Sequence, residues 1–448
     1  MMDPVKIKLQ EQALNAIRDR LSLTQTEEAK ENTIITAFRD FCSNLPYKMP
    51  EAQATGYLQN EKEKERFLEE LENYGIISSL LDDPDVEDII INGTEPIYAH
   101  YSKDGLRKTN KRFESLPELE LLIKKILVFG GKQELRKINN VDLLGMRGRA
   151  NIVYSPLGPE LTITKIKINP LSIIDLIDKG TLNSDMAALL WLYIEGLGMR
   201  AANILVSGGP GAGKTTLLNA LLSFIPSDQH IVVIEDSMEL VTNWIGSTSR
   251  LESDENLTLA DLVKNSLRMR PERIIVGEVR GEEAQDMITA MNIGKYCMGT
   301  IHASTVRELI LRLQSNPMNV PEILINLVDV FIVMKKINTN QCITRVIDEI
   351  TESAGLEQKI VLLSYLWKFD SAISAFSQLS YTNVYRDRLA KASGLSGKQI
   401  LDEINKRKNF LERLRHNKVT PIADVASMCE LYIKSPQLAD SAIDQYKK

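Results

Sequence analysis

A glycine-rich run near the middle of the chain restricts the possible folds more than any other feature of the sequence. Residues 208–215 have the spacing G-x-x-x-x-G-K-[ST]. Glycines let successive backbone N–H groups turn toward one centre and form a cradle for phosphate. In this pattern Lys214 reaches the β- and γ-phosphates, and the hydroxyl of Thr215 binds Mg²⁺. The predicted cradle consists of Gly208, Gly209, Pro210, Gly211, Ala212, Gly213, Lys214, Thr215 and Thr216.

The segments on either side of this run support the same interpretation. Residues 203–207 are mostly apolar, which is typical of a short buried strand. Residues 214–224 carry leucines spaced to bury one face of a helix. A strand, a glycine loop and the N-terminus of a helix form the context that an anion site needs. The sequence therefore predicts a site for ATP and Mg²⁺ rather than a glycine-rich turn without a ligand.

The bulk composition indicates a globular protein of more than one domain. A chain of 448 residues is too long for a single hydrophobic core, so two or three domains are expected. The 54 basic residues are outnumbered by 60 acidic ones, which argues against a nucleic-acid coat protein or a polybasic membrane tail. Its cysteines form no C-x-x-C pair, so we expect buried thiols in a reducing compartment. Because neither a signal-peptide pattern nor a run of about 18 apolar residues occurs, a cytoplasmic protein is expected.

Changes in residue pattern predict the domain organisation. Residues 1–79 alternate charged and apolar positions and are expected to form helices. Residues 80–168 combine strand and helix patterns, which predicts a smaller α+β domain without a catalytic motif. Residues 169–183 begin with Asn-Pro and are interpreted as a linker. Alternating strands and helices over 184–350 predict an α/β domain with a parallel sheet, and strands followed by charged helices are expected over 351–448.

Carboxylates follow the strand that comes next after the cradle. Residues 231–234 are apolar, and Glu235, Asp236 and Glu239 come directly after them. Ligands of open α/β sheets bind at the carboxyl ends of the strands. An ATPase needs a carboxylate there to orient water, so Glu235 and Glu239 are both candidates. The alternative is an acidic helix N-terminus with no catalytic role.

A second carboxylate, Glu278, follows the apolar segment 274–276. Gly277 stands where such a strand usually ends in aspartate, so Glu278 is expected to reach the metal or its water directly. The preceding helix is expected to end near Arg268 and Arg270. We expect these arginines beside the same sheet edge, where they either offset phosphate charge or satisfy the end of the helix.

A third candidate is His302, within Gly-Thr-Ile-His-Ala at 299–303. A single histidine is more often a structural residue than a catalytic one. Here it closes another short strand that we expect at the same edge. A neutral imidazole at that point can respond to the γ-phosphate.

Together these motifs resemble one family, the secretion ATPases of type II and type IV secretion systems and type IV pili. Residues 86–93 and 143–147 also resemble the N-terminal domain of that family, and the helical tail resembles its archaeal branch, which includes the archaellum motor. Four family signatures stand in order: the phosphate loop 208–216, the acidic box 234–239, the G-E box 277–280 and the histidine box 300–303.

The resemblance implies a RecA-like ATPase domain in a homo-hexameric ring. In such a ring, ATP hydrolysis moves the N-terminal domains against the catalytic ones. That movement is expected to drive a polytopic membrane platform protein, which inserts or extracts pilin-like subunits. The expected location is cytoplasmic, at the inner face of the cell membrane, and no nucleic-acid partner is expected.

The resemblance also implies roles for individual residues. Lys214 and Thr215 bind phosphate and Mg²⁺, and Glu278 assists at the metal. Either Glu235 or Glu239 orients the attacking water, and the sequence does not decide between them.

Two further roles concern communication across boundaries. His302 is expected to couple the state of the γ-phosphate to the subunit interface. Arg147, from the N-terminal domain, is expected to reach a nucleotide across a domain or subunit boundary. A planar, permanently charged guanidinium suits that task because it matches phosphate oxygens.

Two positions depart from the family pattern. Thr164 stands where family members often carry arginine, so one cation at the nucleotide is missing unless Lys165 or Lys167 replaces it. Near the histidine box, Gly294 is followed by Lys295 where a Gly-His pair is common. Both departures affect the nucleotide contacts that we expect, but not the expectation of an ATPase.

Two other classes of function stay open at the level of the sequence. P-loop hexamers also act as nucleic-acid translocases or helicases. The acidic balance and the lack of a basic strip interleaved with aromatics argue against that class. A nucleotide-binding scaffold without hydrolysis is the other alternative. The residues that argue against it are Lys214, Thr215, Glu235 and Glu278.

Overall fold

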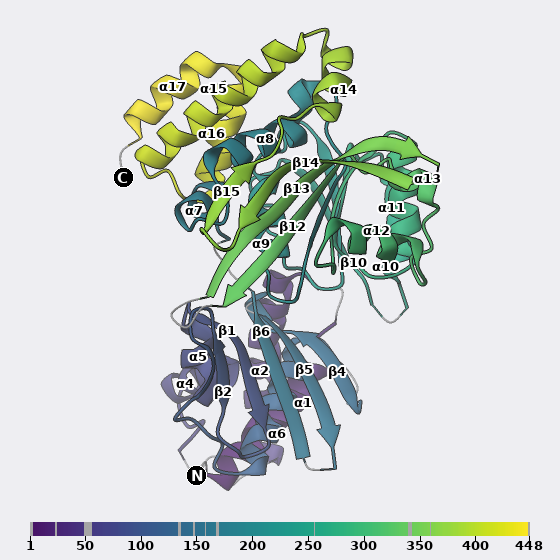
Figure 1. The fold of residues 1–448 in the computed structure, drawn as a ribbon. Coiled ribbons are helices and arrows are strands. Elements are labelled where there is room, and N and C mark those ends of the chain that lie inside the picture. Colours follow the sequence, from purple (N-terminus) through teal and green to yellow (C-terminus); the bar gives the residue numbers. More distant parts are fainter. Residues whose placement is uncertain are drawn as a thin grey trace. The chain divides into compact units, whose positions relative to one another are not determined.

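The structure is a computed structural model. It describes residues 3–22, 25–48, 56–132, 136–146, 148–156, 158–166, 170–254, 256–338, 343–358 and 360–446. The chain divides into two compact units, Met1–Ile168 and Asn169–Lys448 (Figure 1).

The first unit contains an antiparallel sheet with a helix against one face. The strand order is β3-β2-β1-β6-β5-β4. The buried Ile89 and Ile91 of β1 share an apolar core with α6 (Leu116–Phe129). Side chains of a strand alternate between its faces, so these two isoleucines point to the same side. The strands are β1 (Val86–Asn92), β2 (Tyr98–Tyr101), β3 (Gly105–Lys108), β4 (Ile138–Asp142), β5 (Gly148–Ser155) and β6 (Gly158–Lys165).

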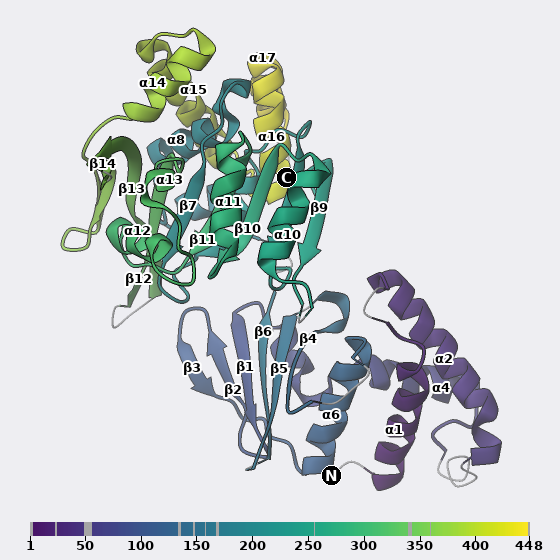
Figure 2. The same ribbon diagram turned by 90° about the vertical axis from the view of Figure 1, so that its right-hand side faces the viewer.

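Helices from the beginning of the chain cover the other side of α6. Leu121 and Phe129 of α6 belong to the apolar core of these helices, whereas Leu122 and Ile126 face the sheet. Residues 1–79, expected as a helical segment of their own, thus lie within the first unit, with α6 buried from both sides (Figure 2). The elements before β1 are α1 (Pro4–Arg18), α2 (Glu27–Lys48), α4 (Glu61–Glu72), η1 (Gly75–Ile77) and α5 (Ser78–Asp82).

The second unit is built on a nine-stranded sheet of order β15-β14-β13-β12-β7-β11-β10-β8-β9. The strands from β12 to β9 in that order run parallel, and β13, β14 and β15 are antiparallel to their neighbours. The glycine loop follows β7, within the parallel part, which confirms the expected RecA-like α/β domain. The strands are β7 (Ile204–Gly208), β8 (His230–Glu235), β9 (Ser247–Glu252), β10 (Arg273–Val279), β11 (Tyr296–Ile301), β12 (Val330–Asn338), β13 (Ile343–Glu357), β14 (Ile360–Asp370) and β15 (Ala375–Gln378).

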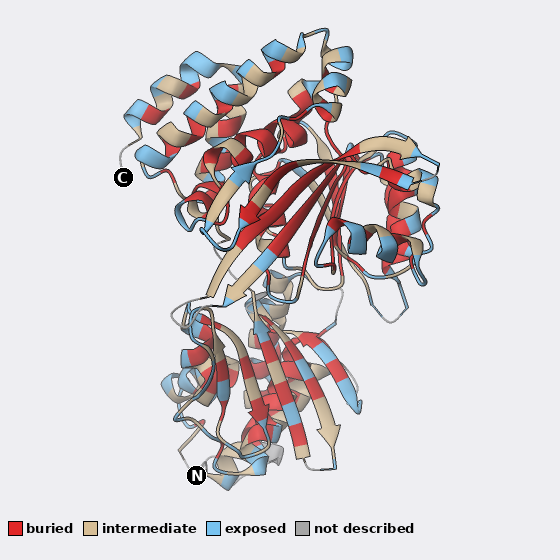
Figure 3. Ribbon diagram, in the orientation of Figure 1, coloured by how far each residue is buried: buried red, intermediate tan, exposed pale blue. Residues whose placement is uncertain are grey.

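Helices cover both faces of this sheet because its central strands are apolar on both sides. Figure 3 shows that these strands are largely buried. In β7, Ile204 and Val206 belong to one apolar core and Leu205 to the other. The first core includes α7 (Ile173–Asp178), α8 (Ser184–Glu195), α9 (Lys214–Leu222) and the tail helices α14 (Val384–Ser393), α15 (Gly397–His416), α16 (Ile422–Lys434) and α17 (Pro436–Gln445). The second includes α10 (Leu259–Ser266), α11 (Glu283–Asn292), α12 (Val306–Gln314) and α13 (Glu322–Ile325). The expected helical tail is therefore confirmed.

The segment 169–183 differs from the linker that we expected. It contains α7, whose first turn is held by a capping box between Ser172 and Asp175. Ile173, Ile174 and Leu176 are buried in the core of the second unit. The Asn-Pro pair at its start led to the expectation of a linker. The short helix forms because its apolar residues pack against α9.

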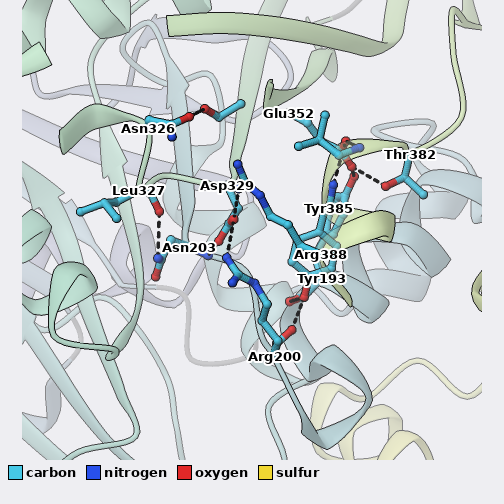
Figure 4. Close-up of polar contacts among 12 residues, drawn as sticks. Tyr193, Arg200, Asn203, Asn326, Leu327, Asp329, Glu352, Thr382, Tyr385 and Arg388 are labelled. Carbon is cyan, nitrogen blue, oxygen red and sulfur yellow. Dashed lines mark hydrogen bonds and ion pairs between the residues drawn. The ribbon is translucent and has the colours of Figure 1, made fainter. Parts of the chain in front are cut away.

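A polar cluster fixes α14 at the amino ends of the parallel strands (Figure 4). Asp329, just before β12, is paired with Arg200 at 3.1 Å and with Arg388 of α14 at 2.6 Å. The buried Glu352 of β13 accepts a hydrogen bond from the Tyr193 hydroxyl at 2.6 Å. Glu352 also accepts the backbone N–H of Val384 at 3.0 Å, at the start of α14. The tail is therefore attached to the sheet by ion pairs and hydrogen bonds as well as by apolar contacts.

The structure bears on two expectations from the composition, which concern the cysteines and membrane-spanning segments. Cys297 and Cys429 are buried, Cys42 is half-buried, and Cys342 lies outside the described residues. Among the residues that the structure describes, no helix is both long and apolar enough to span a bilayer.

Candidate active site

The glycine loop connects β7 to α9, as expected. Gly208, Gly211 and Gly213 have φ angles of 156°, 65° and 93°, which residues with a side chain rarely adopt. Successive glycines in such conformations form the backbone nest that binds phosphate. Within the described part of the chain, no side chain caps the first turn of α9. Its N–H groups are therefore suited to an anion.

Lys214 lies against the loop and against the histidine box. Only 7 % of its surface is exposed. Its Nζ lies 3.4 Å from the Gly209 carbonyl oxygen and 3.4 Å from His302 Nδ1. Burial lowers the pKa of Lys214, although the carboxylate of Glu278 opposes that shift. The ammonium is thus partly desolvated, which strengthens its attraction for a phosphate.

Glu278, near the end of β10, connects these residues to a further cation. One of its oxygens lies 2.6 Å from His302 Nε2, and the other lies 2.5 Å from an Arg280 nitrogen. Burial raises the pKa of Glu278, but the hydrogen bond and charge of Arg280 outweigh it, and the net direction is down. Burial and the charge of Lys214 lower the pKa of His302. At neutral pH the site therefore contains a carboxylate beside a neutral imidazole.

Glu235 ends β8 and is used to hold the loop that follows it. One oxygen accepts the backbone N–H groups of Glu239 at 3.0 Å and of Leu240 at 2.9 Å. The other oxygen is 3.2 Å from an Arg250 nitrogen. Burial raises the pKa of Glu235, and these contacts oppose the shift. A Cβ atom on Gly277 would lie 2.9 Å from Glu235 Cγ, so the glycine of the G-E box leaves room for this carboxylate.

Glu239 and Asp236 lie in the loop after β8. Glu239 is exposed, and its charge acts on the pKa values of both Lys214 and Arg280. Asp236 accepts a hydrogen bond from the Ser253 hydroxyl at 2.6 Å and lies 3.4 Å from Arg280. The acidic box therefore lies near Lys214 and Arg280, the two cations that also act on Glu278.

The expected positions of Arg268 and Arg270 are wrong. Both precede the first residue of β10, Arg273, and β10 runs parallel to β7. They therefore lie at the amino ends of the parallel strands, whereas Lys214 and Glu278 lie at the carboxyl ends. The reason is that α10 runs back along the sheet, so its end meets the opposite edge. Arg270 has a φ of 54° and ends the short helix η4 (Leu267–Met269).

Four positions of the first unit were expected to bear on the nucleotide contacts. Arg147 lies outside the described residues. The Thr164 hydroxyl donates to Asp88 at 2.8 Å, and Lys165 donates to the carbonyl oxygens of Leu80, at 3.3 Å, and of Asp83. Lys165 is therefore engaged within its own unit, and Lys167 lies outside the described residues.

Sequence reasoning gave no role to Arg280 of the G-E box, and it did not single out three further cations near the site. Arg250 of β9 pairs with Glu235, and Lys336 and Arg345 of the β12–β13 hairpin lie next to the glycine loop. None belongs to a motif. A signal for the latter two is available only after the sheet order has placed β12 beside β7.

The donor set at this edge fits Mg²⁺. Mg²⁺ prefers oxygen ligands and typically takes one or two from the protein, with the rest from phosphate and water. Thr215, half-buried in the first turn of α9, offers a hydroxyl, and Glu278 offers a carboxylate held in its charged form.

Comparison with known proteins identifies the family. The family described as "Type II/IV secretion system protein" matches residues 144–413. An uncharacterised protein of Methanocaldococcus jannaschii is 30% identical over an alignment of 376 residues that covers 79% of this chain and 67% of that protein. A second protein of that organism is 35% identical over 264 residues, covering 57% of this chain and 96% of that protein.

A solved structure is also similar. The Legionella pneumophila ATPase DotB is 21% identical, with a TM-score of 0.46, and the match covers 82% of this chain and 94% of that one. With more than half of its residues matched by the family description, the chain belongs to the type II/IV secretion system protein family.

Proposed function

We propose that this chain, an ATPase of the type II/IV secretion family, couples ATP hydrolysis to the assembly or secretion of pilin-like subunits. It acts as a homo-hexamer on a polytopic membrane platform protein, from the cytoplasmic face of the membrane. One observation carries the ATPase part of the proposal. His302 lies 3.4 Å from Lys214 and 2.6 Å from Glu278, beside a glycine loop, at the carboxyl ends of neighbouring parallel strands.

The residues of the site have separate roles in phosphoryl transfer to water. The loop amides and Lys214 hold the β- and γ-phosphates. Glu239 orients the attacking water, since both oxygens of Glu235 are used within the protein. His302 lies between Glu278 and Lys214. A phosphate that binds the Lys214 ammonium competes with the contact between Lys214 and His302, so the imidazole responds to the bound phosphate.

Mg²⁺ would be held by Thr215 and Glu278. When bound, it neutralises charge that develops on the phosphate oxygens. Arg280 keeps Glu278 ionised in the absence of the metal.

Two substitutions test the ATPase. Lys214→Ala removes the cation at the γ-phosphate, and Glu278→Gln removes the charge at the metal. Each is expected to reduce Mg²⁺-dependent phosphate release by about a hundredfold or more. Release of phosphate is measured with the full chain at saturating ATP, with circular dichroism to check folding.

The matched control is Glu282→Gln, which removes an exposed carboxylate of the same loop region. Its turnover is expected to equal that of the unmodified chain. Undiminished turnover in both Lys214→Ala and Glu278→Gln would refute the proposal. Strong stimulation by single-stranded DNA, with a steep dependence on salt, would instead favour a nucleic-acid translocase.

A further inference from the structure

The β12–β13 hairpin brings two cations to the glycine loop that the mechanism above does not use. Lys336 of β12 and Arg345 of β13 are directly opposite each other in the antiparallel pair. The Arg345 Nε–H donates to the Gly211 carbonyl oxygen over 2.9 Å. A Cβ atom on Gly211 would lie 3.7 Å from Lys336 Nζ, and one on Gly213 would lie 3.4 Å from Arg345 Cδ. Both side chains therefore contact the loop region.

The close approach of β12 to β7 makes this reach possible. Met334 is paired with Gly208, the last residue of β7. A Cβ atom on Gly208 would lie 2.6 Å from the Met334 carbonyl oxygen, so only glycine allows this spacing. Because β12 continues past the end of β7 to Asn338, Lys336 stands alongside the loop rather than alongside the strand.

The pairing of two cations is unfavourable by itself. Like charges directly opposite on neighbouring strands destabilise a sheet. Both residues are half-buried, which reduces screening by water, and Lys214 adds a positive charge to the same loop. An anion bound at the loop would offset this repulsion. The arrangement is thus less costly in the nucleotide-bound protein than in the free protein.

We propose that Lys336 and Arg345 are part of the nucleotide site and bind the polyphosphate electrostatically. β12 and β11 flank β7 on opposite sides, so these cations approach from the side away from His302. Arg345 also positions the loop through Gly211, whereas Lys336 contributes charge. The inference depends on the ATPase function proposed above, because it needs a polyphosphate at the loop.

Lys336→Gln separates this role from a structural one. The dissociation constants of Mg-ATP, Mg-ADP and adenosine are measured by calorimetry with the full chain. We expect the first two to rise about tenfold and that of adenosine to stay the same. Without nucleotide, the Tm of the variant should equal or exceed that of the unmodified chain, because the repulsion is gone. The increase in Tm on adding ATP should shrink. A residue with a merely structural role would lower the Tm without nucleotide.

Arg345 is tested by two substitutions. Arg345→Gln removes the charge and is expected to weaken Mg-ATP binding about tenfold. Arg345→Lys restores the charge but not the planar fork, so it should recover only part of the affinity. Recovery by lysine is not expected if the side chain only fills space beside Gly213.

Lys335→Gln is the matched control. Lys335 is the preceding residue of β12, so its side chain lies on the other face of the strand. It pairs there with Asp348 at 3.8 Å. Its removal takes one positive charge from the same hairpin, and affinity for ATP should not change.

The outcomes distinguish this inference from the ATPase proposal. Unchanged ATP affinity in both Lys336→Gln and Arg345→Gln, together with loss of binding in Lys214→Ala, overturns the inference and leaves the ATPase in place. An equal loss of affinity for adenosine and ATP also overturns it. Failure of the unmodified chain to bind ATP overturns both.

Discussion

Gly277 and Glu235 show how single residues at neighbouring strand ends depend on each other. Any side chain at position 277 would bring a Cβ atom within 2.9 Å of Glu235 Cγ. A strand that ended there in aspartate would displace the Glu235 carboxylate from Arg250 and from the backbone N–H groups that it accepts. The departure from the usual hydrophobic-run-then-aspartate pattern therefore has a steric reason. The buried carboxylate at this position comes from β8 rather than from β10.

The two carboxylates of the acidic box are expected to respond differently to removal. Glu235→Ala leaves the N–H groups of Glu239 and Leu240, and the charge of Arg250, without their acceptor. It should lower the free energy of unfolding by about 2–4 kcal/mol. Glu239→Ala changes an exposed residue and should cost at most about 0.5 kcal/mol, while abolishing phosphate release. Urea unfolding and ATP turnover measure the two effects. Full turnover in Glu239→Ala would exclude it as the residue that orients water.

At the scale of elements, α6 holds the first unit together from both sides. Its Lys125 is 6 % exposed and donates to the carbonyl oxygens of Glu70, at 2.8 Å, and Asn73, at 3.3 Å. These oxygens lie at the C-terminal end of α4. The ammonium thus satisfies a helix end inside the protein, at the cost of burying a charge.

Because the buried Lys125 ammonium is costly, the free energy of unfolding depends on pH between the folded and unfolded pKa values of this residue. Burial lowers the pKa of Lys125 from 10.5 to about 8. Between these values the unfolded chain binds more protons, so the contribution of Lys125 to stability rises with pH, by up to about 3 kcal/mol. Lys125→Met should flatten this slope in urea unfolding at pH 8 to 10. Its neighbour Lys124→Met, which removes a less buried charge, should not, and an equal slope in all three proteins would contradict the assignment.

The attachment of α14 to the sheet gives a second prediction at this scale. Glu352→Ala removes the buried acceptor of the Tyr193 hydroxyl and of the N–H groups that begin α14. We expect a loss of about 3 kcal/mol and faster tryptic cleavage within α14, at Arg386 or Arg388. Glu357→Ala, an exposed change in the same strand, serves as the control. Equal cleavage rates in the two variants would show that the apolar contacts alone hold the tail.

At the scale of the whole molecule, the glycine loop and the carboxylates of the site all belong to the second unit. Arg268 and Arg270 are exposed at the opposite edge of the sheet from the loop. In the proposed ring, Arg147 is expected to act on the nucleotide of a neighbouring subunit. The activity of such an assembly depends on protein concentration, because each site needs two chains.

Mixing two inactive variants tests this arrangement. Lys214→Ala removes the cation of the loop, and Arg147→Ala removes the one from the neighbour. Each alone should lower turnover at least about tenfold. Mixed rings contain some sites with both residues intact, so turnover should partly return. Absence of any recovery, in mixtures that gel filtration shows to be assembled, would argue against action across subunits.

Much of this protein could be predicted from the sequence because the signals are local. The glycine spacing at 208–215 specifies backbone angles that few other sequences allow, and strand and helix periodicity specify the elements around it. Since all strands of a parallel sheet present their carboxyl ends at one edge, Glu278 and His302 could be placed together before the fold was known.

Tertiary structure alone decided the features that depend on which elements become neighbours. Glu235 holds Arg250 and the turn that reaches Leu240, and this packing is the reason that we propose Glu239 for orienting the water. Lys336 and Arg345 reach the glycine loop because β12 is placed beside β7, although more than 100 residues separate them along the chain. Residue patterns report the local conformation of a segment. The distances between segments are set by packing and strand order, which no single stretch of sequence contains.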